Sequence, residues 1–254
     1  QAYPILFMVG QPLGIYWGAQ TDGIYANWDE AINSGIAGAA PGEIKYVNNY
    51  IDLDEAGQPL AIQEINFDDY VKIGDPNPDF TYSISNNFSY KKWDASFLFT
   101  GQKGGDLFWV DSWQLSGLQK STNVLTSSFQ NSWIAPITYD NGNFLYDPSV
   151  GNLNNAIHPG AMIDNGKRAI SSDRNIYDGS FLRLKNINIG YNFNFSENRN
   201  MRLYISGQNL IVWTDYPGYD PEVRTYTKNP QKRGVDFGTY PGTKSLLIGL
   251  KFNY

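Results

Sequence analysis

Apolar and polar side chains alternate along residues 244–254, K-S-L-L-I-G-L-K-F-N-Y. One face carries Leu246, Ile248, Leu250, Phe252 and Tyr254, and the other carries Ser245, Gly249, Lys251 and Asn253, with Leu247 as the exception. Side chains of a β-strand alternate between faces, so this pattern predicts a strand with one unbroken apolar side. Such a strand can cross a bilayer, for which about ten tilted residues suffice, or it can close a soluble sandwich.

The same alternation recurs upstream and predicts antiparallel strands near residues 12–20, 79–91, 92–105, 180–195 and 200–214, making six with the terminal one. The hairpin at 79–105 is the clearest, with Lys91 and Lys92 in its turn. Its polar face consists mostly of Ser, Thr and Asn, which suits a water-filled lumen.

The connections between these strands alternate between short turns and the long segments 21–78, 103–179 and 214–243. Bacterial outer-membrane barrels have short periplasmic turns and longer outer loops, so their connections must alternate in this way. The pattern therefore favours an all-β fold, a segment of a transmembrane antiparallel β-barrel with long extracellular loops. A soluble β-sandwich, either a carbohydrate-binding module or a glycan-active enzyme, is the alternative.

The amino-acid composition limits the chemistry and the classes of binding partner that the chain can have. The chain has 254 residues, 15% aromatic residues, a single His, no Cys and a net charge of −6. The absence of Cys excludes disulfides and thiolate catalysis, and the negative charge argues against nucleic acid and anionic lipid headgroups as main partners. No apolar run reaches the roughly 18 residues of a transmembrane helix. No signal peptide opens the sequence, so we expect it to begin at a mature end or within a larger protein.

Several ordered motifs resemble those of SusC/RagA-type TonB-dependent transporters. They are Y-D-G-S-F-L-R-L-K-N-I at 177–187, S-G-Q-N-L at 206–210, Y-P-G-Y-D-P-E at 216–222 and Tyr240-Pro241, and upstream stretches at 18–24, 41–46 and 73–78 follow the same order. A strand that ends on an aromatic residue, here Tyr254, is also similar to the last strand of bacterial outer-membrane barrels. Residues 49–57 depart from the family, which carries an N-G-D-G-like acidic turn there.

The resemblance implies a barrel of about 22 strands around an N-terminal plug. It also implies active import of bulky nutrients, glycan or peptide, across the bacterial outer membrane. TonB would energise import through the plug, and a SusD-like surface lipoprotein would be the partner. Six strands cannot close a barrel, and open edges do not persist in lipid. We therefore expect residues 1–254 to be the C-terminal portion of such a barrel, with the plug and the earlier strands absent from this sequence.

No catalytic constellation is present, so the sequence predicts neither an enzyme nor a cofactor. His158 stands alone in a loop. The acidic residues Asp52, Asp54 and Glu55 lack the remainder of a calcium loop and favour a solvated turn over a metal site. The glycines in 101–105 lack the lysine ending of a phosphate loop and favour a bend in a strand.

Aromatic residues of the long segments are the candidate ligand- or partner-binding residues: Phe108, Trp109, Trp113, Trp133, Tyr139, Tyr216 and Tyr219. Sugars and peptides both pack on aromatic rings, and packing within the loops is the alternative for each ring. In the terminal strand we expect Ile248, Leu250 and Phe252 to face lipid, and Lys251 and Asn253 to face the lumen. Gly249→Ser, on the lumen side, should then be mild.

Overall fold

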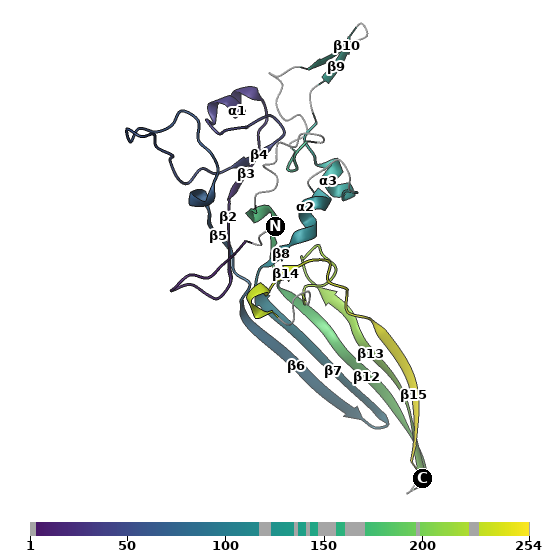
Figure 1. Cartoon of the computed structure of the whole chain (residues 1–254). Coiled ribbons are helices and arrows are strands. Elements are labelled where there is room, and N and C mark those ends of the chain that lie inside the picture. The colour runs from purple at the N-terminus through teal and green to yellow at the C-terminus, as the bar shows by residue number, and fades with distance from the viewer. Residues whose placement is uncertain are drawn as a thin grey trace. The chain divides into compact units, whose positions relative to one another are not determined.

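The computed structural model describes residues 4–116, 123–134, 137–140, 143–146, 156–160, 171–196, 199–223 and 229–253. The chain divides into two units (Figure 1). One comprises residues 1–75 and 108–176, and the other comprises residues 76–107 and 177–254.

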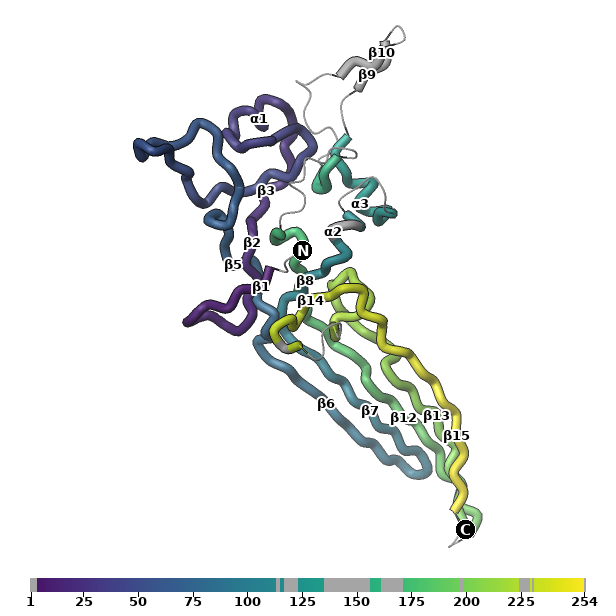
Figure 2. Tube along the Cα trace, in the orientation of Figure 1, coloured from purple at the N-terminus to yellow at the C-terminus, as the bar shows by residue number. Residues whose placement is uncertain are grey.

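The second unit is built on one five-stranded antiparallel sheet in the order β15-β13-β12-β7-β6 (Figures 1 and 2). Its strands are β6 (Pro78–Tyr90), β7 (Trp93–Gly104), β12 (Phe181–Ser196), β13 (Arg199–Trp213) and β15 (Ser245–Asn253). These strands match five of the six predicted segments. Figure 2 shows β7 beside β12, although the whole segment 105–180 separates them in the sequence.

The predicted strand at 12–20 does not join this sheet. It contains only the short β2 (Ile15–Gly18), which pairs with β1 (Ile5–Leu6) and β5 (Val71–Gly74) in the first unit. A Cβ at Gly18 would lie 2.5 Å from the Ser171 carbonyl oxygen, and the Ala19 amide donates to that same oxygen. The stretch is therefore the interior of a packed loop region, buried on both faces, and the sheet has five strands instead of six.

Pairing register places the apolar residues of all five strands on one face. One row across the sheet reads Phe88, Ala95, Ile189, Ile205 and Ile248. In the described chain no second layer covers this face, and Ile248 is 69% exposed. A sandwich would bury such a face against another sheet, whereas a transmembrane sheet turns it to lipid. Lys251 and Asn253 lie on the opposite face, as predicted.

A bulge keeps the two faces distinct near the loop end of the sheet. Leu184 pairs with Phe99 and Asn186 pairs with Leu98. Between these two pairs β12 therefore contains one residue, Lys185, that has no partner in β7. The extra residue reverses the alternation. Leu184 thus stays on the apolar face and Asn186 on the polar one.

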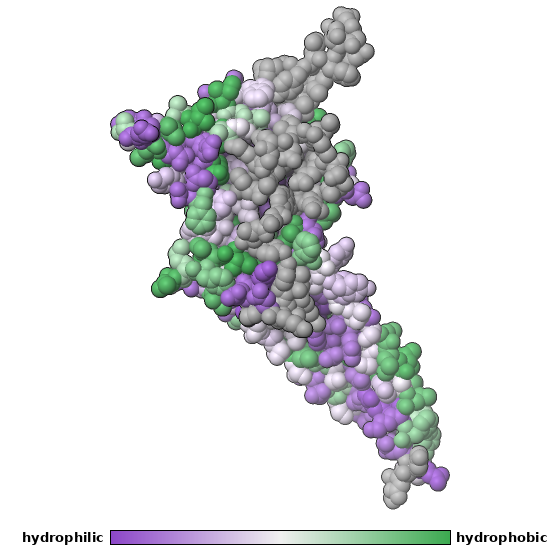
Figure 3. Space-filling model, viewed as in Figure 1, coloured by the Kyte–Doolittle hydropathy of each residue, from purple (hydrophilic) through white to green (hydrophobic). Residues whose placement is uncertain are grey.

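Hydrophilic surface covers part of the sheet in Figure 3. The polar face holds a charged bridge across three strands. Arg202 of β13 forms an ion pair with Asp94 of β7, and its guanidinium also donates to Asn188 Oδ1 of β12 at 2.6 Å. Gly190 lies beneath the guanidinium, where any Cβ would collide with it. A side chain at this position would therefore have to displace the guanidinium.

Gly249 of β15 is similarly covered, by the Tyr204 ring. A Cβ at this position would clash with Tyr204 Cζ, so the ring would have to move aside for Gly249→Ser; that this change is mild stays a prediction. The aromatic ring shields a glycine on the terminal strand.

The first unit contains short elements. Besides β1, β2 and β5 these are β3 (Thr21–Ile24), β4 (Ile44–Tyr46), β9 (Ile137–Asp140), β10 (Asn143–Tyr146), α1 (Trp28–Asn33), α2 (Val110–Ser116), α3 (Thr126–Gln130) and the 3-10 turns η1 (Phe67–Asp69) and η3 (Asp173–Asn175). Strands β8 (Leu107–Trp109) and β11 (Ile176–Tyr177) fall where the chain passes between units, and β14 (Val235–Asp236) and turn η4 (Pro230–Lys232) belong to the second. None of the described helices combines the length and hydropathy needed to span a membrane.

The core of this first unit forms around Trp133. Its ring packs with Ile24, Ala156 and Ile44, and its indole N–H donates to the Ala26 carbonyl at 3.3 Å. A Cβ at Gly42 would lie 2.6 Å from the ring, and φ there is +80°. Glycine is thus required for both space and conformation.

Candidate cargo and partner surface

A buried ion cluster anchors the loop before β15 to the sheet. Arg183 of β12 is 2% exposed, and its Nη2 donates to Asp220 Oδ1 at 2.5 Å. Its Nε lies 2.9 Å from Glu222 Oε2, which Lys185 Nζ also approaches at 3.4 Å. Asp220 further accepts the Gly242 amide at 3.1 Å. Two of the family-like motifs, F-L-R-L-K-N and D-P-E, thus meet in space.

A second buried contact stiffens the same loop. The Tyr216 hydroxyl donates to Asp236 Oδ2 at 2.5 Å, and the Thr239 amide donates to the other oxygen of that carboxylate at 2.8 Å. Asp236 is 1% exposed. Its carboxylate therefore joins the start of the loop to the part that leads into β15.

Beside the ion cluster, the loop end of the sheet bears a polar cavity of about 380 Å³. Its lining residues are mostly hydroxyl, amide and small groups, namely Thr81, Tyr82, Ser83, Thr100, Gly101, Gln102, Phe181 and Glu222. An adjoining cavity of about 330 Å³ shares Thr81, Gln102 and Glu222 with it and adds Arg233. Such groups hydrogen-bond to sugar hydroxyls or to peptide groups.

The cavity residues were not among the candidates that the sequence analysis picked out. Ser83 and Thr100 are ordinary polar residues of alternating strands, and register alone places them opposite each other. The available signal was the small, uncharged polar face of the hairpin, which marks a lumen but not a particular pocket.

The candidate aromatics are placed unevenly. Phe108, Trp109, Trp133 and Tyr216 are buried, at 8%, 8%, 5% and 4% exposure, whereas Tyr219 is 77% exposed. Trp113 lies in α2 and Tyr139 in β9, with side chains outside the described part. Among the candidates whose side chains are described, Tyr219 is therefore the one whose ring is exposed to a ligand or partner. For all seven residues, binding stays a prediction.

The remaining polar candidates have structural contacts. Asp54 Oδ1 accepts the amides of Ala56 and Gln58, each at 2.8 Å, which forms a turn. Arg174 Nη2 lies 3.4 Å from His158 Nδ1, so the lone histidine contacts a neighbouring arginine. Across the described residues, no group of three or more acidic or histidine side chains is arranged to hold a metal ion.

Comparison with known proteins gives consistent relatives. No family model matches the chain. TonB-dependent receptor P3 of Formosa agariphila is 32% identical over 256 residues, covering 96% of this chain and 22% of the relative. TonB-dependent receptor SusC of Bacteroides thetaiotaomicron is 26% identical, covering 79% of this chain and 18% of the relative. The solved RagAB peptide transporter superposes with a TM-score of 0.68 at 19% identity, covering 99% of this chain and 24% of that one.

A sheet with one uncovered apolar face, a polar opposite face and long loops at one end defines part of a transmembrane β-barrel. The relatives then specify its kind. The chain belongs with the SusC/RagA-like TonB-dependent transporters, and it spans about a fifth of the length of the curated relatives that it matches.

Proposed function

We propose that the chain is the C-terminal portion of an active importer of bulky nutrients in the bacterial outer membrane. This proposal rests on the pairing register of the sheet. The register places apolar residues of all five strands on one uncovered face and polar residues on the other. TonB would supply energy through a plug domain that is not part of this sequence. The transport function requires no bond-making chemistry from these residues.

The proposed cargo is a glycan or a peptide. The polar cavity offers hydroxyls from Ser83 and Thr100, an amide from Gln102 and a carboxylate from Glu222. These groups can donate to and accept from either cargo class. Peptide import is named for the similar RagAB structure, and that name supports a peptide as one of the two cargo classes to test here.

Cargo uptake tests this function in the native bacterium. Deletion of the gene should abolish uptake of fluorescently labelled oligosaccharides or peptides, and restoration should require both the gene and an intact TonB system. Uptake of both cargo classes at wild-type rates after deletion would contradict the proposal.

The cavity's role can be separated from barrel assembly. Ser83→Ala combined with Thr100→Val should reduce uptake of the transported class severalfold while barrel abundance stays normal. Ser89→Ala is the matched control, because it lies on the same face of β6 opposite Asp94, near the hairpin turn and far from the cavity. Equal uptake by the two variants would exclude a cargo role for the cavity.

The proposed protein partner is a SusD-like lipoprotein that covers the long loops. Exposed aromatic rings often anchor such interfaces, and Tyr219 is the exposed ring among the candidates. Tyr219→Ala should lower the amount of lipoprotein that co-purifies from membranes. Tyr90→Ala, which removes an exposed ring at the hairpin turn, should leave it unchanged. If both variants retain the lipoprotein, the interface lies elsewhere on the loops.

A further inference from the structure

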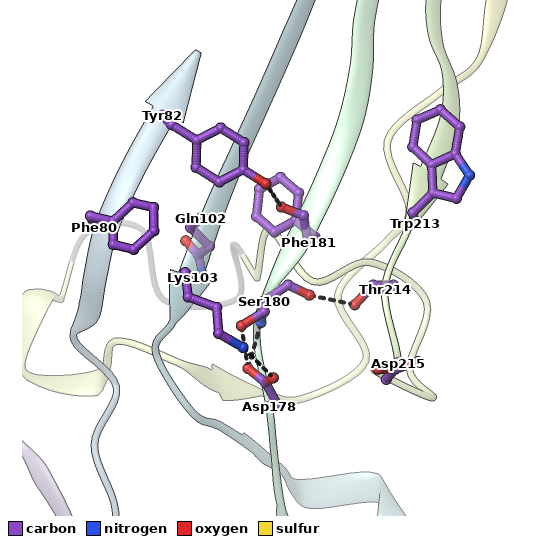
Figure 4. Close-up of a pocket in the computed structure, with 10 residues that line it drawn as sticks. All are labelled: Phe80, Tyr82, Gln102, Lys103, Asp178, Ser180, Phe181, Trp213, Thr214 and Asp215. Atoms are coloured by element: carbon purple, nitrogen blue, oxygen red, sulfur yellow. Dashed lines mark hydrogen bonds and ion pairs between the residues drawn. The ribbon is translucent and has the colours of Figure 1, made fainter. Parts of the chain in front are cut away.

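A third cavity, of about 570 Å³, lies at the loop end of the sheet (Figure 4). The pairing register shows at which row of the sheet this cavity lies. The row Ile84, Phe99, Leu184 and Ile211 carries apolar side chains, and the next row towards the loops reads Tyr82, Gly101, Leu182 and Trp213. The cavity therefore begins one step beyond the last aliphatic row of the lipid-facing side. Aromatic residues at that level are typical of the membrane–water boundary of barrels.

Two aromatic walls face each other across the sheet. On β6, the Tyr82 ring covers Gly101, whose Cβ would lie 2.5 Å from it, and the Tyr82 hydroxyl donates to the Phe181 carbonyl at 3.4 Å. On β13, Trp213 is 48% exposed and its ring centroid lies 6.3 Å from that of Phe99 on the lipid side. Figure 4 shows Trp213 on the opposite side of the cavity from Tyr82. The Tyr82 ring thus fills the space above Gly101, and the cavity forms a recess between this ring and Trp213.

Charged groups occupy the loop side of this recess. Lys103 Nζ lies 3.7 Å from Asp178 Oδ2, and Asp178 Oδ1 accepts the Ser180 amide at 2.8 Å and the Ser180 hydroxyl at 2.6 Å. Burial opposes ionisation of Asp178, but the Ser180 hydrogen bonds and the Lys103 ammonium outweigh it and lower the pKa. Asp215 is exposed and forms no hydrogen bond or ion pair with any other described residue. The cavity thus combines one cation with two carboxylates.

We propose that this cavity binds the phosphoethanolamine headgroup of a membrane lipid. Trp213 and Tyr82 would flank the start of the acyl region, the lipid ammonium would approach Asp215 and Asp178, and the phosphate would approach Lys103. A purely anionic headgroup fits poorly because the carboxylates outnumber the cation. An ammonium group near the Trp213 ring gains a cation–π contact as well. Tyr82 and Trp213 belong to the lipid-facing side, while Gln102 and Phe181 line both this cavity and the one proposed for cargo.

Lipid binding to the full-length transporter in detergent tests this assignment. The probes are short-chain phosphatidylethanolamine, phosphatidylcholine and phosphatidylglycerol, and the readouts are the shift in melting temperature and native mass spectrometry. We expect phosphatidylethanolamine to bind at least tenfold more tightly than phosphatidylglycerol. Phosphatidylcholine should bind less tightly as well, because its methylated ammonium cannot donate hydrogen bonds to the carboxylates.

Matched variants localise the effect. Asp215→Asn should remove most of the preference for phosphatidylethanolamine, and Lys103→Gln should weaken binding of all three lipids. Asp79→Asn and Lys91→Gln make the same changes at residues of the β6–β7 hairpin that do not line the cavity, and they should behave as wild type. Equal binding of the three lipids by wild type, or a shared response of cavity and control variants, overturns the proposal.

The lipid that co-purifies identifies the source of the headgroup. A glycerophospholipid and a phosphoethanolamine-modified lipid A present the same group, and their masses distinguish them. Recovery of either from wild type, with loss from Asp215→Asn, supports the site. Equal recovery from both proteins contradicts it.

Discussion

Removal of the Arg183 guanidinium should release the loop before β15 from the sheet. Arg183→Met keeps the length and apolar stem of the side chain but leaves Asp220 as a buried carboxylate without its cation. Asp220 is 7% exposed, so little water can replace the lost partner. Breaking a buried pair by deleting one member costs about 3–5 kcal/mol. Free energy of that size should appear as local opening of the loop.

Hydrogen exchange of the loop measures this cost directly. Opening that is easier by about 3 kcal/mol corresponds to roughly hundredfold faster exchange at 1.4 kcal/mol per tenfold. The informative amides are those that hold the cluster together, Glu222, which donates to Asp220 Oδ1, and Gly242, which donates to Oδ2. Peptides from the hairpin β6–β7 should keep their wild-type protection, because the sheet register does not depend on the cluster.

A neighbouring variant supplies the control. Lys185→Met removes the other cation near Glu222, but that pair is longer and its side chains are 31% and 28% exposed. Exposed pairs contribute about 0–1 kcal/mol, so exchange should accelerate only a fewfold. Equal acceleration by the two variants, or none with Arg183→Met, would refute the view that burial gives this cluster its strength.

Three further changes test the apolar face of the sheet, the charged bridge on its polar face and a histidine of the first unit. Ile248→Arg should cost roughly 2–4 kcal/mol in lipid and lower barrel abundance in membranes, whereas Leu247→Arg on the opposite face should be better tolerated; equal abundance would contradict the assigned faces. Gly190→Ala should displace the Arg202 guanidinium and lower the temperature at which the barrel loses its heat-modifiable gel mobility; an unchanged transition would show that the bridge adapts. Burial and a nearby cation lower the pKa of His158 below its ordinary 6.5, so protonation favours the unfolded segment and protection of its amides should fall as the pH drops below about 6.5; His158→Gln should remove that dependence, and a pH-independent wild type would exclude it.

The strands of the sheet could be predicted from the sequence because a period of two is visible without any partner. Ile248, Leu250 and Phe252 recur at alternate positions in the terminal strand, and all three lie on the exposed apolar face. The strand expected at 12–20 is present as β2, but it belongs to the small sheet of the first unit, because alternation also arises in a short strand buried on both sides. Contacts with residues far away in the sequence, the Ser171 carbonyl and the Ile73 side chain, show that Gly18 is enclosed.

The burial of loop aromatics could not be predicted in the same way. Trp133 and Tyr219 both lie in long segments rich in turn residues, yet one forms a core and the other is open to solvent. What decides is a distant neighbour, Gly42, whose missing side chain makes room for the Trp133 ring. The pattern of neighbouring residues in the sequence carries no information about such a long-range contact.

The ion cluster shows what the short motif F-L-R-L-K-N encodes physically. Leu182 and Leu184 pair with Trp213 and Ile211 on the lipid side, while Arg183 and Lys185 between them reach Glu222. The bulge at Lys185 then shifts the alternation by one residue, so the apolar face continues with Ile187 and Ile189. This one motif thus specifies both the lipid-facing side of the strand and the ion pairs that anchor the loop. A single-residue insertion in it would move the leucines off the lipid face and the cations off the loop at once, because both depend on the same register.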